Sequence, residues 1–208
     1  LPKNPLIVTP VEEIGQYGGT WRRAWVGLSD QWGPNKICHE HLVMFDKGGT
    51  KVLPNIAESW KVSSDARVYT FKIREGLKWS DGTPLTTEDV MFWYEDVVMN
   101  KELTPTVATW LTAGGKPCKI EKVDTYTFRV SFEQPNPLFL INICKFGGNQ
   151  FFLPKHYGKQ FHIKYTPKEE LEKKAKDAGF QFWYQLFDAR VSNSNAWLQN
   201  PELPVLHP

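Results

Sequence analysis

Residues 53–100 read LPNIAESWKVSSDARVYTFKIREGLKWSDGTPLTTEDVMFWYEDVVMN and contain the clearest structural pattern in the chain. Within Val68–Arg74, apolar and polar residues alternate, a period of two that predicts a strand with one buried face. Trp60–Ser63 is the expected partner strand, joined through a tight turn at Ser64–Ala66. We expect a short helical turn before this hairpin.

A capped helix is predicted after the hairpin. Trp79–Pro84 is rich in turn-forming residues and should end the sheet segment. Thr86, followed three residues later by Asp89, fits a helix N-cap with an acid in the first turn. The apolar residues of the predicted helix share one face: Val90, Trp93, Tyr94 and Val97. We therefore expect residues 86–99 to form a helix that covers the sheet.

A second alternating segment predicts a second hairpin. Apolar residues of Tyr126–Phe132 alternate with polar ones, the turn falls at Asp124–Thr125, and Pro135 ends the unit. Both hairpins should contribute to one antiparallel sheet. Elsewhere, the pattern predicts strands at Thr20–Val26 and Gln150–Leu153, a short helix at Leu138–Cys144, a helix from a Thr166 cap and Pro167 to Ala178 that stops at Gly179, and another at Phe180–Val191.

Composition excludes several classes of protein. The chain has 208 residues and a net charge of +2, and no basic stripe is visible, which argues against a nucleic-acid partner. No apolar run approaches the length of a membrane span. The chain begins with Leu1 instead of Met, which leaves open that a leader has been removed.

The sequence gives no support for a metal, a cofactor or catalysis. The three cysteines lack zinc-type spacing, and the run Cys38–His41 supplies too few ligands on one face, so buried cysteines and ordinary loop histidines are expected. Nucleophile and phosphate-loop motifs are absent. The acidic pairs Glu12–Glu13, Glu95–Asp96 and Glu169–Glu170 should lie on the solvated surface, as should the Lys- and Glu-rich run 168–176.

The central segment resembles the signature of family 5 solute-binding proteins, the oligopeptide, dipeptide, nickel and oligosaccharide receptors of ABC importers. The residues that carry the resemblance are Pro54, Ala57–Trp60, Asp65, Tyr69–Arg74, Gly76–Leu85 and Glu88–Val90, with weaker agreement at Tyr17–Thr20, Asn136–Phe139 and Leu153–Tyr157.

The resemblance implies an α/β, periplasmic-binding-protein-like class II fold that is incomplete here. Residues 1–46 and 150–208 would form part of lobe I, and residues 47–149 a smaller α+β accessory domain with two β-hairpins and a covering helix. A second lobe would follow Pro208, so we expect an amino-terminal fragment whose affinity for solute is weak or undetectable when it is alone. The exposed edges of a truncated lobe also suggest a homodimer.

The same resemblance suggests binding residues near a cleft. Sugars stack on aromatic rings and need polar partners for their hydroxyls, whereas peptides need backbone partners. The candidate ligand-binding residues are Trp25, Asp30, Trp32, Trp110, Asn149 and Gln150. For Trp25 and Trp32 a place in the core stays equally open, while Trp60, Trp79 and Trp93 are expected in the core.

Nine tryptophans favour oligosaccharides slightly over short peptides as the solute. The implied partner is the permease of an ABC importer, and the implied location is periplasmic or extracellular, with a lipid anchor before processing left open. The alternatives are a ligand-free structural or interaction module of the same half-fold and, third, an enzyme of unrecognised type.

Overall fold

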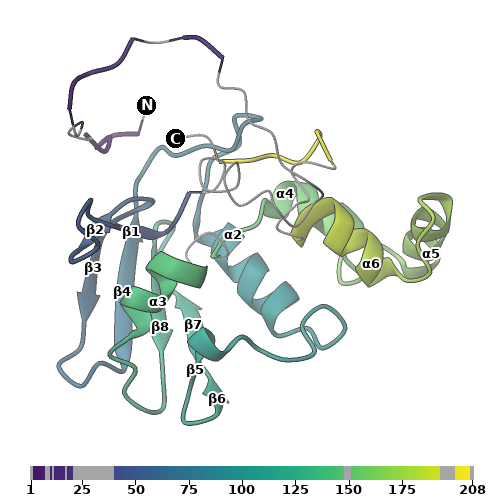
Figure 1. Ribbon diagram of the computed structural model, residues 1–208. Coiled ribbons are helices and arrows are strands. Elements are labelled where there is room, and N and C mark those ends of the chain that lie inside the picture. The colour runs from purple at the N-terminus through teal and green to yellow at the C-terminus, as the bar shows by residue number, and fades with distance from the viewer. Residues whose placement is uncertain are drawn as a thin grey trace.

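A four-stranded antiparallel sheet forms the centre of the described structure (Figure 1). The computed structural model describes residues 2–7, 10, 12–16, 18–20, 40–147, 151–192 and 200–206. The strand order is β3-β4-β8-β7. The bounds are Ala57–Val62 for β3, Val68–Ile73 for β4, Lys119–Lys122 for β7 and Thr127–Ser131 for β8.

Both predicted hairpins are confirmed. In the first turn, the amide of Ser63 donates to the carbonyl of Val68 at 2.9 Å, and Ala66 takes a positive φ of 54°. In the second, the amide of Tyr126 donates to the carboxylate of Asp124 at 2.8 Å. Strand β4 also pairs with β8, with Val68 opposite Ser131 and Lys72 opposite Thr127, and this pairing joins the two hairpins into one sheet.

The helical turn expected before the first hairpin is wrong. Residues Val52–Pro54 form strand β2, which pairs antiparallel with β1, Val43–Phe45. The amide of Ala57 donates to the carbonyl of Leu42 at 2.8 Å, so the backbone there is satisfied by a distant segment and not by its own turn.

Short helices make up most of the remaining structure. The helices up to residue 147 are α2 (Thr87–Met91), its π-helical continuation η2 (Phe92–Val98), the 3-10 turn η3 (Thr109–Leu111) and α3 (Phe139–Asn142) with the π-helical η4 (Ile143–Gly147). The small hairpin of β5 (Thr112–Ala113) and β6 (Lys116–Pro117) follows η3. The later helices are α4 (Lys155–Gly158), η6 (Lys159–Phe161), α5 (Lys168–Asp177), α6 (Trp183–Phe187) and η7 (Asp188–Ser192).

One face of the sheet is covered by aromatic side chains. Phe71 and Phe128 lie on adjacent strands and stack with ring centroids 5.3 Å apart. Phe139 of α3 packs on Phe71 at 6.4 Å, and Phe151 packs on Phe128 at 6.0 Å. Burying so many large rings is the main contribution to the stability of this region.

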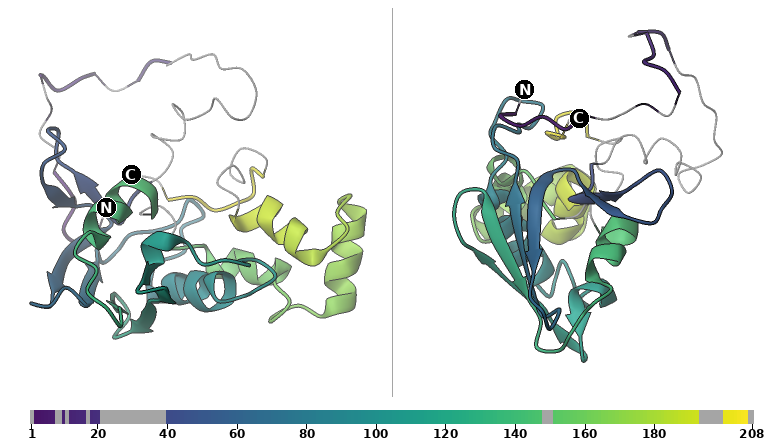
Figure 2. Two further views of the ribbon diagram at one scale, coloured as in Figure 1. Left: turned by 60° about the horizontal axis from the view of Figure 1, so that its bottom comes forward. Right: turned by 90° about the vertical axis from the view of Figure 1, so that its left-hand side faces the viewer.

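The predicted helix over residues 86–99 is confirmed as α2 and η2, but it is buried on two sides and not one. Trp93 joins the core beneath the sheet, whereas Phe92 and Val97 join a second core with Leu171 and Phe187. The second core belongs to the segment from α4 to α6, which extends away from the sheet (Figures 1 and 2). The single apolar face expected from the sequence therefore accounts for only one of the two buried sides of this helix.

The strand expected at Gln150–Leu153 and the helix cap expected at Thr166 are both wrong in the described residues. The described part of the strand expected at Gln150–Leu153 is irregular, because Phe151 and Phe152 insert their rings into the core and Pro154, which has no amide donor, follows. Gln150 and all of the strand expected at Thr20–Val26 except Thr20 lie outside the described residues. The Thr166 hydroxyl donates to the carbonyl of Lys159 and does not cap α5.

Helix α5 (Lys168–Asp177) stops just before Gly179, the residue that was predicted to end it. The amide of Gly179 donates to the carbonyl of Lys176 and that of Phe180 to the carbonyl of Ala175, which is the Schellman arrangement. Phe180 therefore belongs to the end of α5, and α6 begins only at Trp183. The predicted short helix near Leu138–Cys144 is confirmed as α3.

No helix among the described residues is both long enough and apolar enough to span a membrane.

Replacing Gly179 by alanine should destabilise the chain, because Gly179 has a φ of +82°, where a Cβ is strained. We expect a loss of about 1 kcal/mol in the free energy of unfolding, measured by urea denaturation. Gly48→Ala is the matched control, since Gly48 has no positive φ and a Cβ there meets only ordinary contacts. Equal midpoints for the two variants would contradict this account of the end of α5.

Candidate functional site

Trp110 is the one predicted ligand-binding residue that the structure describes, and it lies on an aromatic shelf. Its ring is nearly parallel to that of Trp93, with an interplanar angle of 8° and centroids 6.2 Å apart. Its centroid lies 5.6 Å from that of Phe151. Trp93 and Phe151 are buried, whereas Trp110 is only partly buried. We call Trp93, Trp110 and Phe151 the aromatic shelf, and Trp110 is its partly exposed member.

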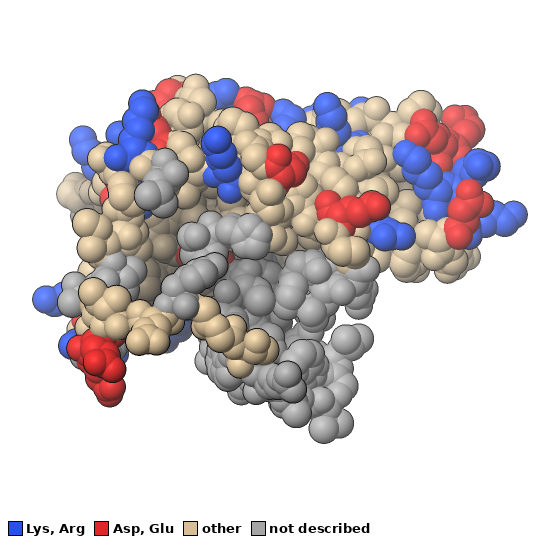
Figure 3. Space-filling view, turned by 90° about the horizontal axis from the view of Figure 1, so that it is seen from above, with Lys and Arg blue, Asp and Glu red and all other residues tan. Residues whose placement is uncertain are grey.

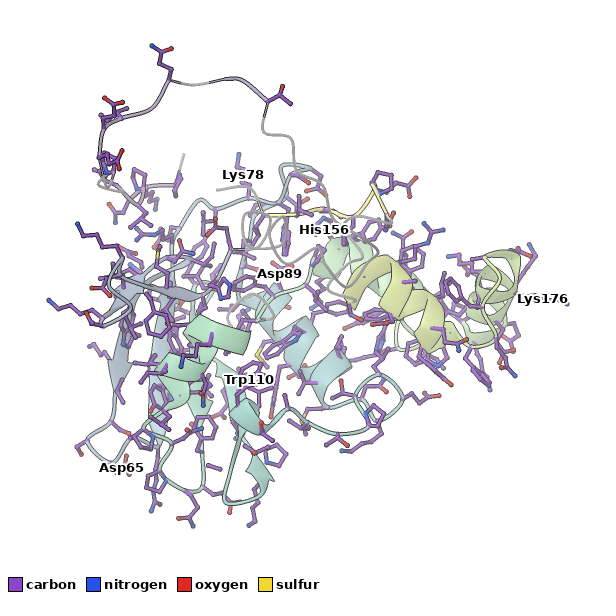
Figure 4. All side chains as sticks on the ribbon, viewed as in Figure 1. Asp65, Lys78, Asp89, Trp110, His156 and Lys176 are labelled. Atoms are coloured by element: carbon purple, nitrogen blue, oxygen red, sulfur yellow. The ribbon has the colours of Figure 1, made fainter. Side chains whose placement is uncertain are left out.

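The chain holds Trp110 in this place through its neighbours. Leu111 is buried, and its carbonyl accepts a hydrogen bond from the amide of Cys118 at 2.7 Å. The hydroxyl of Tyr94, on η2, donates to the carbonyl of Cys118 at 2.9 Å. Turn η3 is therefore attached to the helix that supplies Trp93. Figure 4 labels Trp110 between α3 and the helix begun by α2.

Such a shelf is suited to binding apolar surfaces. A flat indole with one supported face and one partly open side can stack against the C–H face of a sugar or against a side chain of a peptide.

The other five predicted ligand-binding residues, Trp25, Asp30, Trp32, Asn149 and Gln150, lie outside the described residues. Phe151 is the first described residue after Asn149 and Gln150 and belongs to the shelf. The expected core tryptophans Trp79 and Trp93 are buried, and Trp60 is partly buried against the same core.

A junction of charged groups, which sequence analysis missed, attaches α2 to α4. Asp89 is buried, and its carboxylate accepts from the amides of Thr86 and Lys155, both at 3.0 Å. Thr86 and Asp89 form the predicted cap as a full capping box. Burial raises the pKa of Asp89, and the hydrogen bonds from the two amides act in the opposite direction. The cap is recognisable from the local sequence, whereas no local pattern marks Lys155 as a partner of Asp89.

Three further side-chain contacts lie around this junction. Glu88 accepts from Lys122 of β7 and from Lys155 of α4, each at 2.6 Å. His156 lies 2.7 Å from the carboxylate of Asp81. Figure 4 shows Asp89 and His156 close together where α2 meets α4. The sheet, α2 and α4 are therefore fixed to one another at one place.

The expected surface position of Asp96 is wrong. Only 4% of its surface is exposed, because the side chain accepts hydrogen bonds from Lys164 and Tyr165. The Lys- and Glu-rich run of α5 is solvated as predicted, with ion pairs four residues apart such as Lys174–Glu170 at 2.7 Å. Figure 3 shows positive and negative side chains intermixed at that end of the molecule.

The described residues offer little for catalysis or metal binding. Burial raises the pKa of the Cys118 thiol to about 12 and that of Cys144 to about 11, so both stay protonated and unreactive at neutral pH. Within the described ranges, no group of three or more His, Cys, Asp or Glu side chains is placed to hold a metal ion. Cys38 and His39 lie outside those ranges.

Comparison with known proteins identifies the family. Residues 51–183 match the model of bacterial extracellular solute-binding proteins, family 5 (middle region). The matched region is more than half of the chain and includes both hairpins, the junction and the aromatic shelf. The chain belongs to this family of solute-binding proteins, and the predicted family is confirmed.

Individual relatives agree with this assignment. The periplasmic alpha-galactoside-binding protein of Rhizobium meliloti is 30% identical over 189 residues, which are 80% of this chain and 27% of that protein. Di/tripeptide-binding protein 1 of Pseudomonas aeruginosa is 32% identical over 116 residues, 50% of this chain and 22% of that protein. Both are solute-binding proteins by name.

Solved structures confirm the expected α/β fold of periplasmic binding proteins. An oligopeptide-binding protein OppA matches 99% of this chain and 31% of its own with a TM-score of 0.88 and 45% identity. The periplasmic binding protein MelB of Agrobacterium fabrum, solved with stachyose, matches 88% of this chain and 25% of its own, with a TM-score of 0.58 and 25% identity. The chain thus spans between about a fifth and a third of the length of these relatives.

Replacing Glu88 by glutamine should weaken the junction in a pH-dependent way. Hydrogen bonds from Lys122 and then Lys155 lower the pKa of Glu88 to about 2 from its ordinary 4.5. A lowered pKa gives stability that is present above pH 4.5 and is lost as the pH falls from 4.5 towards 2. Because the ion pairs are half exposed, we expect Glu88→Gln to cost at most about 1 kcal/mol at pH 7.

The measurement is the free energy of unfolding in urea at pH 7.0 and pH 3.0 for the native chain and the variant. The difference should be smaller at pH 3.0. Glu169→Gln, an exposed change in the first turn of α5, is the control and should have little effect at either pH. A constant difference at both pH values would show that the charge of Glu88 does not stabilise the junction.

Proposed function

We propose that this chain acts as part of a solute-binding protein of an ABC importer, which captures oligopeptides or oligosaccharides outside the membrane and delivers them to the permease. The observation that carries the proposal is the family match over residues 51–183, which covers the folded centre of the chain. We propose no catalytic activity, because the family is one of solute-binding proteins.

Two solute classes are favoured by different relatives. The structural likeness to the oligopeptide-binding protein OppA, over 99% of the chain, supports a peptide. The relative that is similar over 80% of the chain carries alpha-galactoside in its name and supports an oligosaccharide, as does the partly exposed Trp110. The aromatic shelf is compatible with both solutes, because sugar faces and peptide side chains both offer apolar surface.

The division of the chain into units is part of the same proposal. We propose that residues 47–149 form the accessory unit and that residues 1–46 and 150–208 contribute to one lobe. Both apolar cores contain side chains from the two units: Phe151 joins the sheet core, and Phe92 joins the core of α5 and α6. This shared packing supports close contact between the two proposed units.

A periplasmic or extracellular location and attachment through a lipid anchor also belong to this proposal. So does a homodimer, which the exposed apolar residues Leu138, just before α3, and Ile141, within it, would favour, with 59% and 38% of their surface exposed. Sedimentation equilibrium tests the dimer, and a clean monomer at high concentration would contradict it. The alternative of a ligand-free module predicts no solute binding at all.

The decisive test of the proposed function is a titration of the chain with short peptides and with stachyose, followed by tryptophan fluorescence and calorimetry. We expect weak binding of one of the two classes, with a dissociation constant above the micromolar range. Trp110→Ala should weaken that binding about 3- to 10-fold, the range given by loss of one aromatic contact. Trp110→Phe should restore part of the affinity, because a smaller ring still stacks.

Phe182→Ala is the matched control. Phe182 is also an exposed aromatic residue that stacks on a neighbour, Tyr184 at 5.2 Å, but it lies at the start of α6 and not on the aromatic shelf. Equal loss of affinity in Trp110→Ala and Phe182→Ala would contradict the role of the shelf. Saturable binding with no change in Trp110→Ala would retain the receptor function and move the binding site elsewhere.

A further inference from the structure

A buried histidine connects the loop after η6 to the side of η2 that faces away from the sheet. Only 2% of the surface of His162 is exposed. Its Nε2 lies 2.8 Å from the carbonyl oxygen of Asp96, and the amide of Lys164 lies 3.2 Å from its Nδ1. A carbonyl accepts and an amide donates, so Nε2 carries the proton and Nδ1 accepts, which makes the ring neutral.

Aromatic rings surround the imidazole on its other sides. Its centroid lies 5.3 Å from that of Trp183, 5.4 Å from that of Phe187 and 6.1 Å from that of Phe92. Trp183 and Phe187 belong to α6, whereas Phe92 belongs to η2. The ring therefore fills the centre of the second apolar core, where a positive charge is poorly solvated.

Asp96 is the common hydrogen-bond partner of three residues in the segment 162–165. Its carbonyl binds His162, and its carboxylate accepts from the Lys164 ammonium at 2.7 Å and from the Tyr165 hydroxyl at 2.5 Å. These contacts attach residues 162–165 to η2 at one point. The same residues connect α4 and η6 to α5, so this point positions the later helices on η2.

We propose that His162 is an acid-sensitive contact, whose protonation releases the segment from η6 to η7 from its place on η2. A second proton can go only on Nδ1, where it would point at the amide hydrogen of Lys164. The hydrogen bond from that amide would then be replaced by repulsion between two donors. The result is a loosening of residues 159–192, while the sheet, which makes no contact through His162, stays unchanged.

The charged groups that face His162 act in both directions. Burial lowers the pKa of His162 below its ordinary 6.5, and Lys164 adds to this. Asp96, on η2, and Glu102, which accepts from the indole of Trp183 at 3.4 Å, raise the pKa but do not outweigh burial. The residues of α6 at the ring, Trp183 and Phe187, are uncharged, and the other titratable side chain packed on it is Tyr165, with ring centroids 5.8 Å apart.

The sign of the effect follows from this lowered pKa. In the unfolded chain His162 binds a proton below about pH 6.5, whereas the folded chain resists that proton. Stability due to the neutral ring is therefore fully present above pH 6.5. It is lost as the pH falls from 6.5 through the lower pKa of the folded state.

Amide hydrogen exchange of the full chain at pH 7.5 and pH 5.0 tests the proposal, after correction for the intrinsic pH dependence of exchange. We expect protection of residues 159–192 to fall severalfold at pH 5.0 relative to pH 7.5, because the folded chain resists the proton that the unfolded chain binds. Residues 57–73 of the first hairpin should keep their protection. His162→Gln retains a side-chain amide that can donate to Asp96 but cannot titrate, so its protection should not change with pH.

His41→Gln is the matched control. His41 is only partly buried and also has a backbone carbonyl near its ring, that of Ile143 at 3.5 Å, but it lies outside the second core. This variant should keep the native pH response in residues 159–192. An equal pH response in the native chain and in His162→Gln would overturn the proposal.

A direct titration covers the case in which His162→Gln does not fold. The ring resonances of His162 in the native chain are followed by NMR from pH 8 to pH 4. Titration below pH 6.5 that coincides with loss of protection in residues 159–192 supports the proposal. A pKa at or above 6.5, or titration without any loss of protection, overturns it. Neither readout involves solute, so failure here is distinct from failure of the proposed function.

Discussion

The buried carboxylate of Asp89 is the interaction on which the arrangement of the chain depends. It accepts from Thr86 at the start of α2 and from Lys155 at the start of α4, while the carbonyl of the same residue accepts from Leu153 at 3.4 Å. A carboxylate without donors would be costly in this position. The start of the helix that covers the sheet and the segment that leads to α4 must therefore form together.

The contact of Asp89 with Thr86, three residues away, was predictable from the sequence. The Thr86 and Asp89 pair and both hairpin turns are recognisable because their hydrogen bonds join residues at most five positions apart. Lys155 lies 66 residues from Asp89, and no local pattern marks it as a partner. The burial of Asp96 was missed for the same reason, since its partners Lys164 and Tyr165 are 68 and 69 residues away.

Apolar patterns were less informative about helices than about strands. The period of two in Val68–Arg74 has one interpretation, whereas the apolar run at Phe151–Leu153 fits a strand or any other buried segment. A helical-wheel projection of residues 86–99 predicts one apolar face, and this prediction is correct only for a helix that packs against a single neighbour. Here η2 is π-helical and packs against two cores, so Phe92 and Trp93 are both buried although they are adjacent in the sequence.

The two sides of η2 connect the candidate site to the rest of the chain. Residue types alone suggested Trp110, but its parallel packing on Trp93 and its contact with Phe151 follow from tertiary structure. Trp93 supports the aromatic shelf from one side of η2, while Asp96 holds His162 on the other. Because the backbone of one short helix carries both contacts, a displacement of η2 changes the shelf and the histidine contact together. This helix therefore positions both Trp93 of the shelf and the partner of the buried histidine.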